Sequence, residues 1–172
     1  IIAPTNFRAD PNLGGGGYLQ DVGNHVLSAL LIGTGLRATE VSARMDNPEL
    51  DLRTSVNLRF ACGAVGDVGV YGDVCPPVTG YWGVDQWSFL GDLGSVRREM
   101  SGGLYLHEWG KAPVEVGAGE LSPSVGPEAN FLHALRGDAE LIAPARAAVE
   151  VVQVIEAAYE SARAGRPVRI ER

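Results

Sequence analysis

Two residues near the N-terminus have types and spacing suited to proton transfer. Asp21 and His25 are four positions apart, so on a helix they lie on one face and can touch. A carboxylate beside an imidazole orients the ring and favours its protonated form, as general acid–base catalysis requires. The alternative is an ordinary surface pair, because this spacing is common on helices. Spacing alone favours the ordinary surface pair.

Two neighbouring residues favour a site over a surface pair. Gly23 lies between Asp21 and His25, in a helix interior where glycine costs about 1 kcal/mol relative to alanine. Glycine at such a position is typical of backbone that a ligand approaches closely. Asn24 adds a polar side chain directly beside His25.

Four glycines, Gly14 to Gly17, precede this pair and raise the possibility of a phosphate-binding turn. A dinucleotide-binding turn needs G-x-G-x-x-G directly after a strand. Here the third glycine is missing, and "NFRADPNL" before the run is not strand-like. "GTGLRA" at 33–38 fits the spacing better, but a helix precedes it and a strand follows, which is the reverse order. We expect the glycines to mark a close backbone approach.

The other polar candidates are weaker. His107 and Glu108 are neighbours on a strand-like segment, so their side chains point to opposite faces. No Cys or His spacing is typical of a zinc site, and we expect no bound metal. A metal-dependent hydrolase that uses Asp21, His25 and His107 is the least favoured interpretation.

The elements that must position these residues follow a simple order. Residues 1–16 are expected to be irregular and 17–32 helical, and helices are expected again at 127–137 and 144–165. Between them the apolar period is two, which predicts an antiparallel sheet with one buried face. The order predicts an α+β fold, with a mainly antiparallel open sheet and helices packed on one face. The strand-like segments are 39–45, 55–63, 68–74, 81–92, 95–100, 104–109 and 113–116.

Composition excludes several classes of protein. The chain has 172 residues, 45% hydrophobic and 20% charged, which suits a packed core in a single domain. Its net charge of −7 argues against nucleic acid as a partner, since phosphate contacts need clustered Lys and Arg. No apolar stretch is long enough to span a membrane. With Cys62 and Cys75 as its two cysteines, we expect reduced thiols and a cytoplasmic location.

Three segments together resemble one protein family. Residues 7–31, "FRADPNLGGGGYLQDVGNHVLSALL", resemble the signature that opens the C-terminal domain of the glucose–fructose oxidoreductase / inositol dehydrogenase family (Gfo/Idh/MocA). Residues 85–99 are similar to its strand–turn–strand element, and 130–137 with 159–170 are similar to its usual ending. Ser28 stands where the family often has Asp. The opening signature matches at Arg8, Asp10, Gly15, Gly16, Gly17, Asp21, Gly23 and His25.

The resemblance implies an oxidoreductase that transfers a hydride between a sugar or polyol and NAD or NADP. It implies that His25 accepts the hydroxyl proton, while Asp21 holds the imidazole ring or binds a substrate hydroxyl. Gly23 and Asn24 are then expected beside the substrate, with Arg8 close by. The family's sheet also implies a homodimer or homotetramer formed through its open face, for which an exposed apolar surface would supply the driving force.

The resemblance covers only the second half of such an enzyme. The family's N-terminal Rossmann domain, with its glycine fingerprint and the lysine of an E-K-P motif, has no counterpart here. The single lysine, Lys111, lies in "WGKAPVE". Residues 1–172 are therefore expected to form one C-terminal substrate-binding and oligomerisation domain, inactive and without bound cofactor by itself. The alternative is a stand-alone, non-catalytic binding or oligomerisation module.

Overall fold

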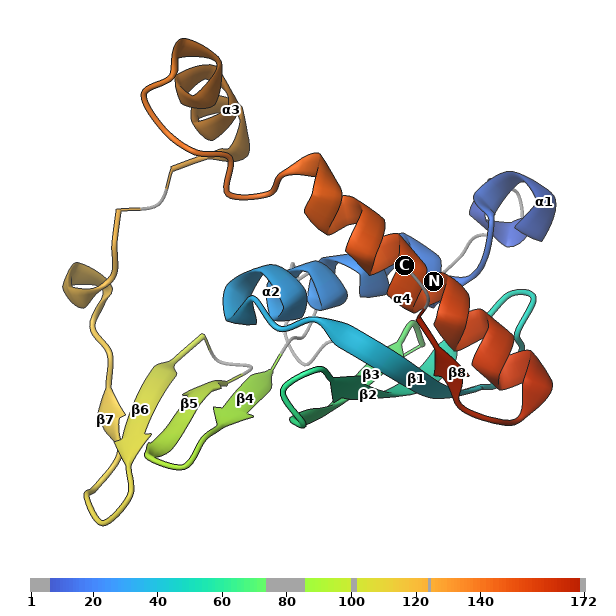
Figure 1. The fold of residues 1–172 in the computed structure, drawn as a ribbon, viewed down its shortest axis with the longest axis horizontal. Coiled ribbons are helices and arrows are strands. Elements are labelled where there is room, and N and C mark those ends of the chain that lie inside the picture. The colour runs from blue at the N-terminus through green and yellow to red at the C-terminus, as the bar shows by residue number, and fades with distance from the viewer. Residues whose placement is uncertain (1–6, 74–85, 100–101, 124, 171–172) are drawn as a thin grey trace. The chain divides into compact units, whose positions relative to one another are not determined.

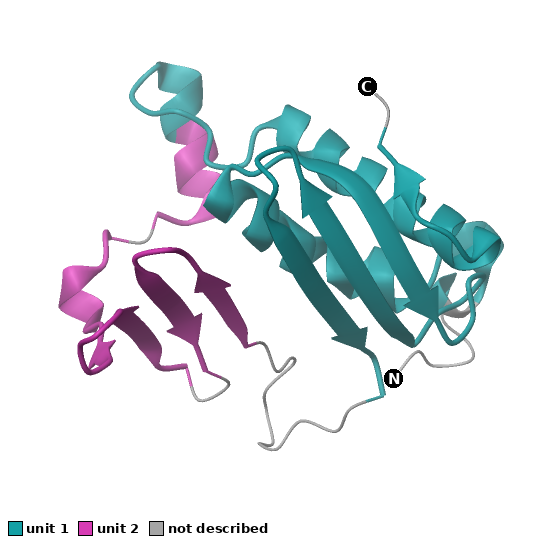
Figure 2. Cartoon of the chain, turned by 60° about the horizontal axis from the view of Figure 1, so that its bottom comes forward, with its two compact units in different colours: residues 1–74, 133–172 teal, residues 75–132 magenta. Residues whose placement is uncertain are grey.

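The computed structural model describes residues 7–73, 86–99, 102–123 and 125–170. The chain falls into two compact units, residues 1–74 with 133–172 and residues 75–132 (Figure 2). No helix of the described ranges is long and apolar enough to cross a membrane.

The first unit is built on a four-stranded antiparallel sheet in the order β3-β2-β1-β8. Its side chains alternate strictly along β2, where Val56, Leu58 and Phe60 are buried and the residues between them are exposed. This confirms the period-two prediction for the first strands. The strands are β1 (Ala38–Met45), β2 (Arg53–Phe60), β3 (Val65–Tyr71) and β8 (Val168–Arg169).

Helices cover one face of this sheet (Figure 1). They are α2 (Asn24–Thr34), which continues directly from a π-helix at Leu19–Gly23, and α4 (Ala145–Ala164). Leu27 of α2 and Val154 and Ile155 of α4 are almost completely buried in the core of this unit. Burying a side chain of this size contributes about 1.5–3 kcal/mol. Burial of these side chains between helix and sheet therefore stabilises the first unit.

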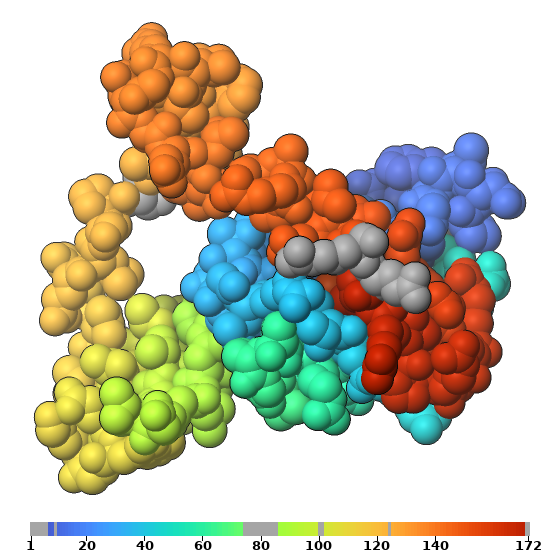
Figure 3. Space-filling model, in the orientation of Figure 1, coloured from blue at the N-terminus to red at the C-terminus, as the bar shows by residue number. Residues whose placement is uncertain are grey.

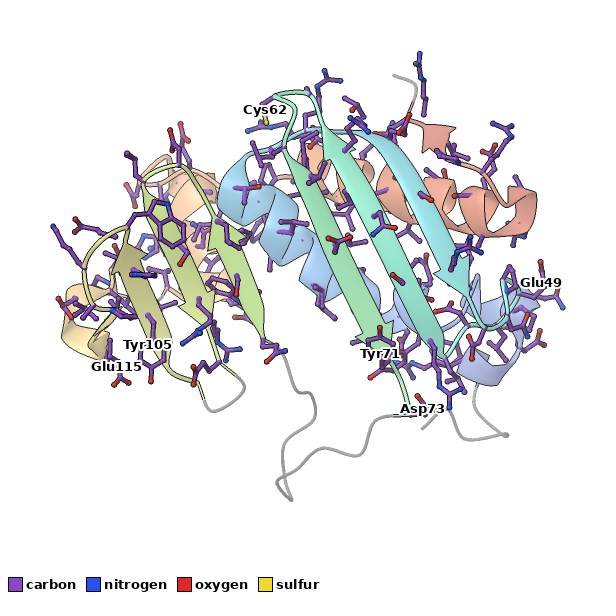
Figure 4. All side chains as sticks on the ribbon, turned by 90° about the horizontal axis from the view of Figure 1, so that it is seen from below. Glu49, Cys62, Tyr71, Asp73, Tyr105 and Glu115 are labelled. Carbon is purple, nitrogen blue, oxygen red and sulfur yellow. The ribbon has the colours of Figure 1, made fainter. Side chains whose placement is uncertain are left out.

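The opposite face of the sheet is polar (Figure 4). Arg59 pairs with Glu40 across neighbouring strands at 3.6 Å, and Arg53 pairs with Asp73. Tyr71, at the end of β3, is half-exposed. The open face of this sheet is therefore not the apolar surface that the resemblance implied, because charged and polar residues occupy most of its outward positions, with Val65 as an apolar exception.

The second unit holds another antiparallel sheet, in the order β4-β5-β6-β7. An apolar row crosses one of its faces, since the register places Phe89, Val96, Leu106 and Val114 opposite one another. The strand-like segment expected at 81–92 is described only from residue 86 on, so Tyr81 and Trp82 lie outside the described residues. The rings of Trp87 and Phe89 contact each other, with their centres 5.0 Å apart and their planes tilted by 46°. The strands are β4 (Trp87–Leu90), β5 (Gly94–Arg98), β6 (Leu104–Glu108) and β7 (Val114–Glu115), followed by a 3-10 turn at Ala118–Glu120.

The α+β fold class is confirmed, with four differences in detail. The strands form two sheets, and β8 is too short to produce a sequence pattern, although it pairs with β1. The lead-in contains a 3-10 turn at Phe7–Ala9 and a short helix α1 (Pro11–Gly14). The first long helix starts as a π-helix. The expected helix at 127–137 is α3 (Pro127–Arg136), and both α3 and α4 are followed by a left-handed glycine.

The glycine run is explained by a close backbone approach, as expected. Gly17 is buried, and a Cβ atom there would overlap the backbone N and O atoms of Asp51. The Tyr18 N–H donates to this same Asp51 carbonyl at 2.7 Å. Any side chain at position 17 would separate the two segments.

We expect Gly17→Ala to lower the free energy of unfolding by about 1–3 kcal/mol, the usual range for overpacking a close contact. Gly33→Ala is the matched control, because Gly33 lies in α2 with open space around its Cβ position. The free energy of unfolding of Gly33→Ala should rise by up to about 1 kcal/mol, because alanine has a higher helix propensity than glycine. Urea unfolding of both variants measures the difference, and equal effects would contradict a close approach at Gly17.

Candidate functional site

Asp21 lies on the π-helix and is bound by Arg8. Its carboxylate accepts a hydrogen bond from Arg8 Nε at 2.8 Å, and both side chains remain partly exposed. The Arg8 guanidinium also lies over the Phe7 ring, 4.7 Å from its centre. Single π-turns often occur at functional sites, because their widened turn displaces side chains from regular helix positions. The structure thus presents a carboxylate and an arginine together at the surface.

His25 does not share this contact. It is exposed in the first turn of α2, and among the described residues no hydrogen bond or ion pair joins it to Asp21. The i,i+4 rule holds for an α-helix, whereas here the intervening backbone has π geometry. The expected Asp21–His25 contact is therefore not formed, and Asp21 pairs with Arg8 instead.

Gly23 and Asn24 are both removed from solvent, Gly23 fully and Asn24 in part. Gly23 is buried, and a Cβ atom there would meet the side chains of Leu19 and Val70. Packing alone is therefore sufficient to favour glycine at position 23. Asn24 Nδ2 donates to the Gln20 carbonyl at 3.0 Å, which fixes the orientation of the amide.

This orientation leaves Asn24 Oδ1 buried, and it has no hydrogen-bond partner among the described residues. A buried acceptor without a donor costs about 1–3 kcal/mol. Its neighbour on the chain is His25, and Asp21 lies three positions earlier. A ligand that brings a hydroxyl to this acceptor would remove that cost.

A buried carboxylate lies behind the site. Asp51 is completely buried and accepts hydrogen bonds from Tyr159 Oη and Thr54 Oγ1, both at 2.6 Å, and from Leu19 N at 3.0 Å. Tyr159 Oη in turn accepts from Gly17 N at 2.9 Å. This network joins α4, the β1–β2 connection and the lead-in to the π-helix.

The β1–β2 connection that presents Asp51 is closed by Asp46. Its Oδ1 accepts from the backbone N–H groups of Asn47, Leu52 and Arg53, each at 3.0 Å. Desolvation alone would raise the pKa of the Asp46 carboxyl, but these backbone donors outweigh it and lower the pKa.

Sequence reasoning missed Asp51 and Tyr159 as residues that support the site. The available signals were an acidic residue between two leucines, Leu50 and Leu52, and a tyrosine on the apolar stripe of α4. Neither signal identifies the other residue, because 108 positions separate the two partners.

Within the part of the chain that the structure describes, the remaining polar groups form no second centre. No three His, Cys, Asp or Glu side chains of the described ranges are grouped to hold a metal ion. Cys62 is a free, exposed thiol, and Cys75 lies outside the described residues. A hollow of about 200 Å³ in the second unit is smaller than typical ligand pockets. It is lined by Ser88, Leu90, Ser95, Arg97, Tyr105, His107 and Pro113.

Comparison with family models agrees with this architecture. The model described as GFO/IDH/MocA C-terminal domain matches residues 2–97, more than half of the chain. The chain belongs to the GFO/IDH/MocA C-terminal domain family. A second model, described as oxidoreductase family C-terminal alpha/beta domain, matches residues 126–170 of this GFO/IDH/MocA domain. No curated protein matches the chain.

Solved structures share the fold. Aldose-aldose oxidoreductase from Caulobacter crescentus, complexed with glycerol, is 22% identical with a TM-score of 0.78, and the match covers 98% of this chain and 52% of that one. An inositol dehydrogenase homolog from Azotobacter vinelandii, complexed with NAD+, is 20% identical with a TM-score of 0.75, covering 95% and 51%.

A levoglucosan dehydrogenase in complex with NADH and L-sorbose is 19% identical with a TM-score of 0.80, covering 99% of this chain and 54% of that chain. The GFO/IDH/MocA domain thus spans about half the length of the solved structures it matches.

Burial and the hydrogen bond to Asp51 raise the pKa of Tyr159 well above its ordinary value of 10.0. Above pH 10 an unfolded chain loses this phenolic proton while the folded chain keeps it, so stability falls as pH rises. Below pH 10, Tyr159→Phe should be less stable than wild type by about 1–3 kcal/mol. Because Phe cannot ionise, that gap should narrow above pH 10.

Urea unfolding at a series of pH values between about 8 and 11 measures the gap. Tyr71→Phe, at a half-exposed tyrosine, is the matched control and should follow the wild-type curve. A gap between wild type and Tyr159→Phe that stays constant with pH would show that Tyr159 is not held protonated by the fold.

Proposed function

We propose that this chain is the substrate-side domain of an NAD(P)-dependent oxidoreductase that transfers a hydride between a sugar or polyol and a nicotinamide. The observation that carries the proposal is the pairing of Arg8 with Asp21, which lies on a π-turn, in a domain of the GFO/IDH/MocA family. It is supported by the solved relatives described with glycerol, and with NADH and L-sorbose.

In this proposal the residues of the chain bind the substrate and handle its proton. As hydride leaves a carbon that carries a hydroxyl, the hydroxyl proton needs an acceptor, and exposed His25 is the candidate. Asp21, held by Arg8, accepts a hydrogen bond from a substrate hydroxyl. Asn24 Oδ1 can accept a second one, and Gly23 lies beside it. Arg8 both contacts the substrate and orients Asp21.

The glycine run of the chain does not suit a dinucleotide. The Gly17 N–H already donates to Tyr159, and the Cβ position of Gly16 faces the same phenol, so these two glycines are engaged within the fold and do not offer their backbone to a phosphate. We therefore propose that NAD or NADP binds to an N-terminal Rossmann domain in a longer protein, and that residues 1–172 bind no cofactor alone. The low cysteine count keeps a cytoplasmic location as our prediction.

A second candidate is a stand-alone, non-catalytic binding or oligomerisation module. The absence of an Asp21–His25 contact among the described residues favours it, since His25 then lacks an orienting carboxylate. The two candidates differ in whether a substitution at His25 changes turnover.

In the longer protein we expect Asp21→Asn and His25→Ala each to lower kcat by about 10²- to 10⁴-fold, the usual contribution of a positioned acid–base group. Affinity for the nicotinamide cofactor should stay within about twofold, because neither residue is proposed to touch it. His133→Ala, at an exposed histidine on α3, is the control and should keep wild-type kcat.

The readout is reduction or oxidation of the nicotinamide with a panel of sugars and polyols. Unchanged turnover in His25→Ala would remove this residue from the mechanism and favour the binding module.

We also propose that the protein forms a homodimer or homotetramer through an open sheet face. The face of β4–β7 that carries the apolar row is the better candidate, because Leu106 and Val114 are 44% and 64% exposed on neighbouring strands. Exposed apolar rows of this kind are typical of subunit interfaces.

Leu106→Asp should therefore shift the protein toward the monomer in sedimentation velocity, because it places a charge in that row. Val65→Asp, on the other sheet at a position 72% exposed, should leave the distribution unchanged. A monomeric wild-type protein would contradict the oligomer proposal outright, without bearing on the hydride-transfer proposal.

A further inference from the structure

The helix that carries the proposed site begins without a local cap. Tyr18 precedes the π-helix, and its side chain makes no capping hydrogen bond. The first amides of a helix have no partner within the helix and need acceptors from elsewhere. Here three consecutive amides, those of residues 17–19, donate to Tyr159 and Asp51, which come from α4 and from the β1–β2 connection.

We propose that Asp51 and Tyr159 are positioning residues: they determine where this helix starts, and so the directions in which Asp21 and His25 project. The inference deepens the proposed function and rests on it for the role of those two side chains. Asp51 provides both its carbonyl and its carboxylate to the helix start, and Tyr159 orients the carboxylate while binding Gly17.

The connection from Tyr159 to Asp21 is short. Tyr159 Oη accepts from the Gly17 N–H, and the Gly17 carbonyl accepts from the Asp21 N–H at 3.1 Å. Two hydrogen bonds therefore separate the phenol from the backbone of Asp21. Because successive residues of an α-helix are about 100° apart around its axis, a small change in where the helix starts turns a side chain away from its partner. The Arg8–Asp21 pair therefore depends on the residue at which the helix starts.

The carboxylate also favours this helix electrostatically. A negative charge at a helix N-terminus interacts favourably with the partial positive charge of the unpaired amides. Asp51 is completely buried, so water does not weaken this interaction as it does at a surface. Because both of its oxygens accept hydrogen bonds, the carboxylate has one defined orientation, and this orientation fixes the backbone of residues 17–19.

Thr54 provides a matched control for Tyr159. Both hydroxyls donate to the Asp51 carboxylate at 2.6 Å, and both residues are buried. Only Tyr159 also accepts from Gly17. Thr54→Val therefore removes one donor to Asp51, whereas Tyr159→Phe removes one donor and also releases the helix start.

The test is amide hydrogen exchange and ¹H–¹⁵N spectroscopy on the ¹⁵N-labelled 172-residue chain. The amide of Val154, on the buried side of α4, reports global opening and serves as the reference. In Tyr159→Phe we expect the exchange rates of the Gly17 and Asp21 amides to rise on the order of tenfold more than that of Val154. The resonances of residues 21–25 should shift as well. In Thr54→Val the same amides should change by less than about threefold relative to Val154.

Gly16→Ala is a second variant, in case Tyr159→Phe fails to fold. A Cβ at position 16 would lie 2.6 Å from Tyr159 Oη, so it displaces the phenol from Gly17 without deleting it. The same exchange pattern is expected. Equal changes in these variants and in Thr54→Val would overturn the proposal, because the network would then only stabilise the fold.

These outcomes are independent of the proposed reaction, since the readout needs no substrate. Shifted resonances at residues 21–25, together with normal turnover in Asp21→Asn, would refute the hydride-transfer role and leave the positioning role intact. Unshifted resonances together with a loss of turnover in Asp21→Asn would refute the positioning role and leave the hydride-transfer role intact.

Discussion

The buried carboxylate of Asp51 is the constraint on which the rest of this structure depends. A charged group without exposure is tolerated only where donors surround it, and here two hydroxyls and a backbone amide do so. Those donors come from α4, β2 and the helix lead-in, which are far apart in the chain. Satisfying one carboxylate therefore fixes how the main helices of the first unit meet its sheet.

This constraint explains both the glycine run and the unusual helix that follows. Gly17 must lie against the backbone of Asp51, so no side chain is possible there. The chain then enters a π-turn that carries Asp21, and the Asp21 carboxylate pairs with Arg8. The feature that first suggested an acid–base dyad is instead an arginine–carboxylate pair next to an exposed imidazole. In the proposed function, a substrate rather than a neighbouring carboxylate is the partner of His25.

The two sheets differ in the character of their faces, where the sequence predicted a single sheet. In the first unit the outward face carries ion pairs such as Arg59–Glu40, which suit contact with water. In the second unit the apolar row through Leu106 lacks such pairs along its length. The alternation of side chains along a strand shows that the two faces of a sheet differ, but it does not show which face a helix covers. Which face is covered depends on where α2 and α4 pack, and both helices belong to the first unit.

Local sequence by itself determined the α+β class, the strands β1 and β2, and the helices α3 and α4, because periodicity and glycine caps are properties of neighbouring residues. It also placed Asp21, Gly23 and His25 on one helical segment, and it predicted the close backbone approach at the glycines. Only the tertiary structure decided that Arg8 binds Asp21 and that Tyr159 meets Asp51 across 108 positions. The physical reason is that a buried charge selects its partners by distance in space, which no local pattern records.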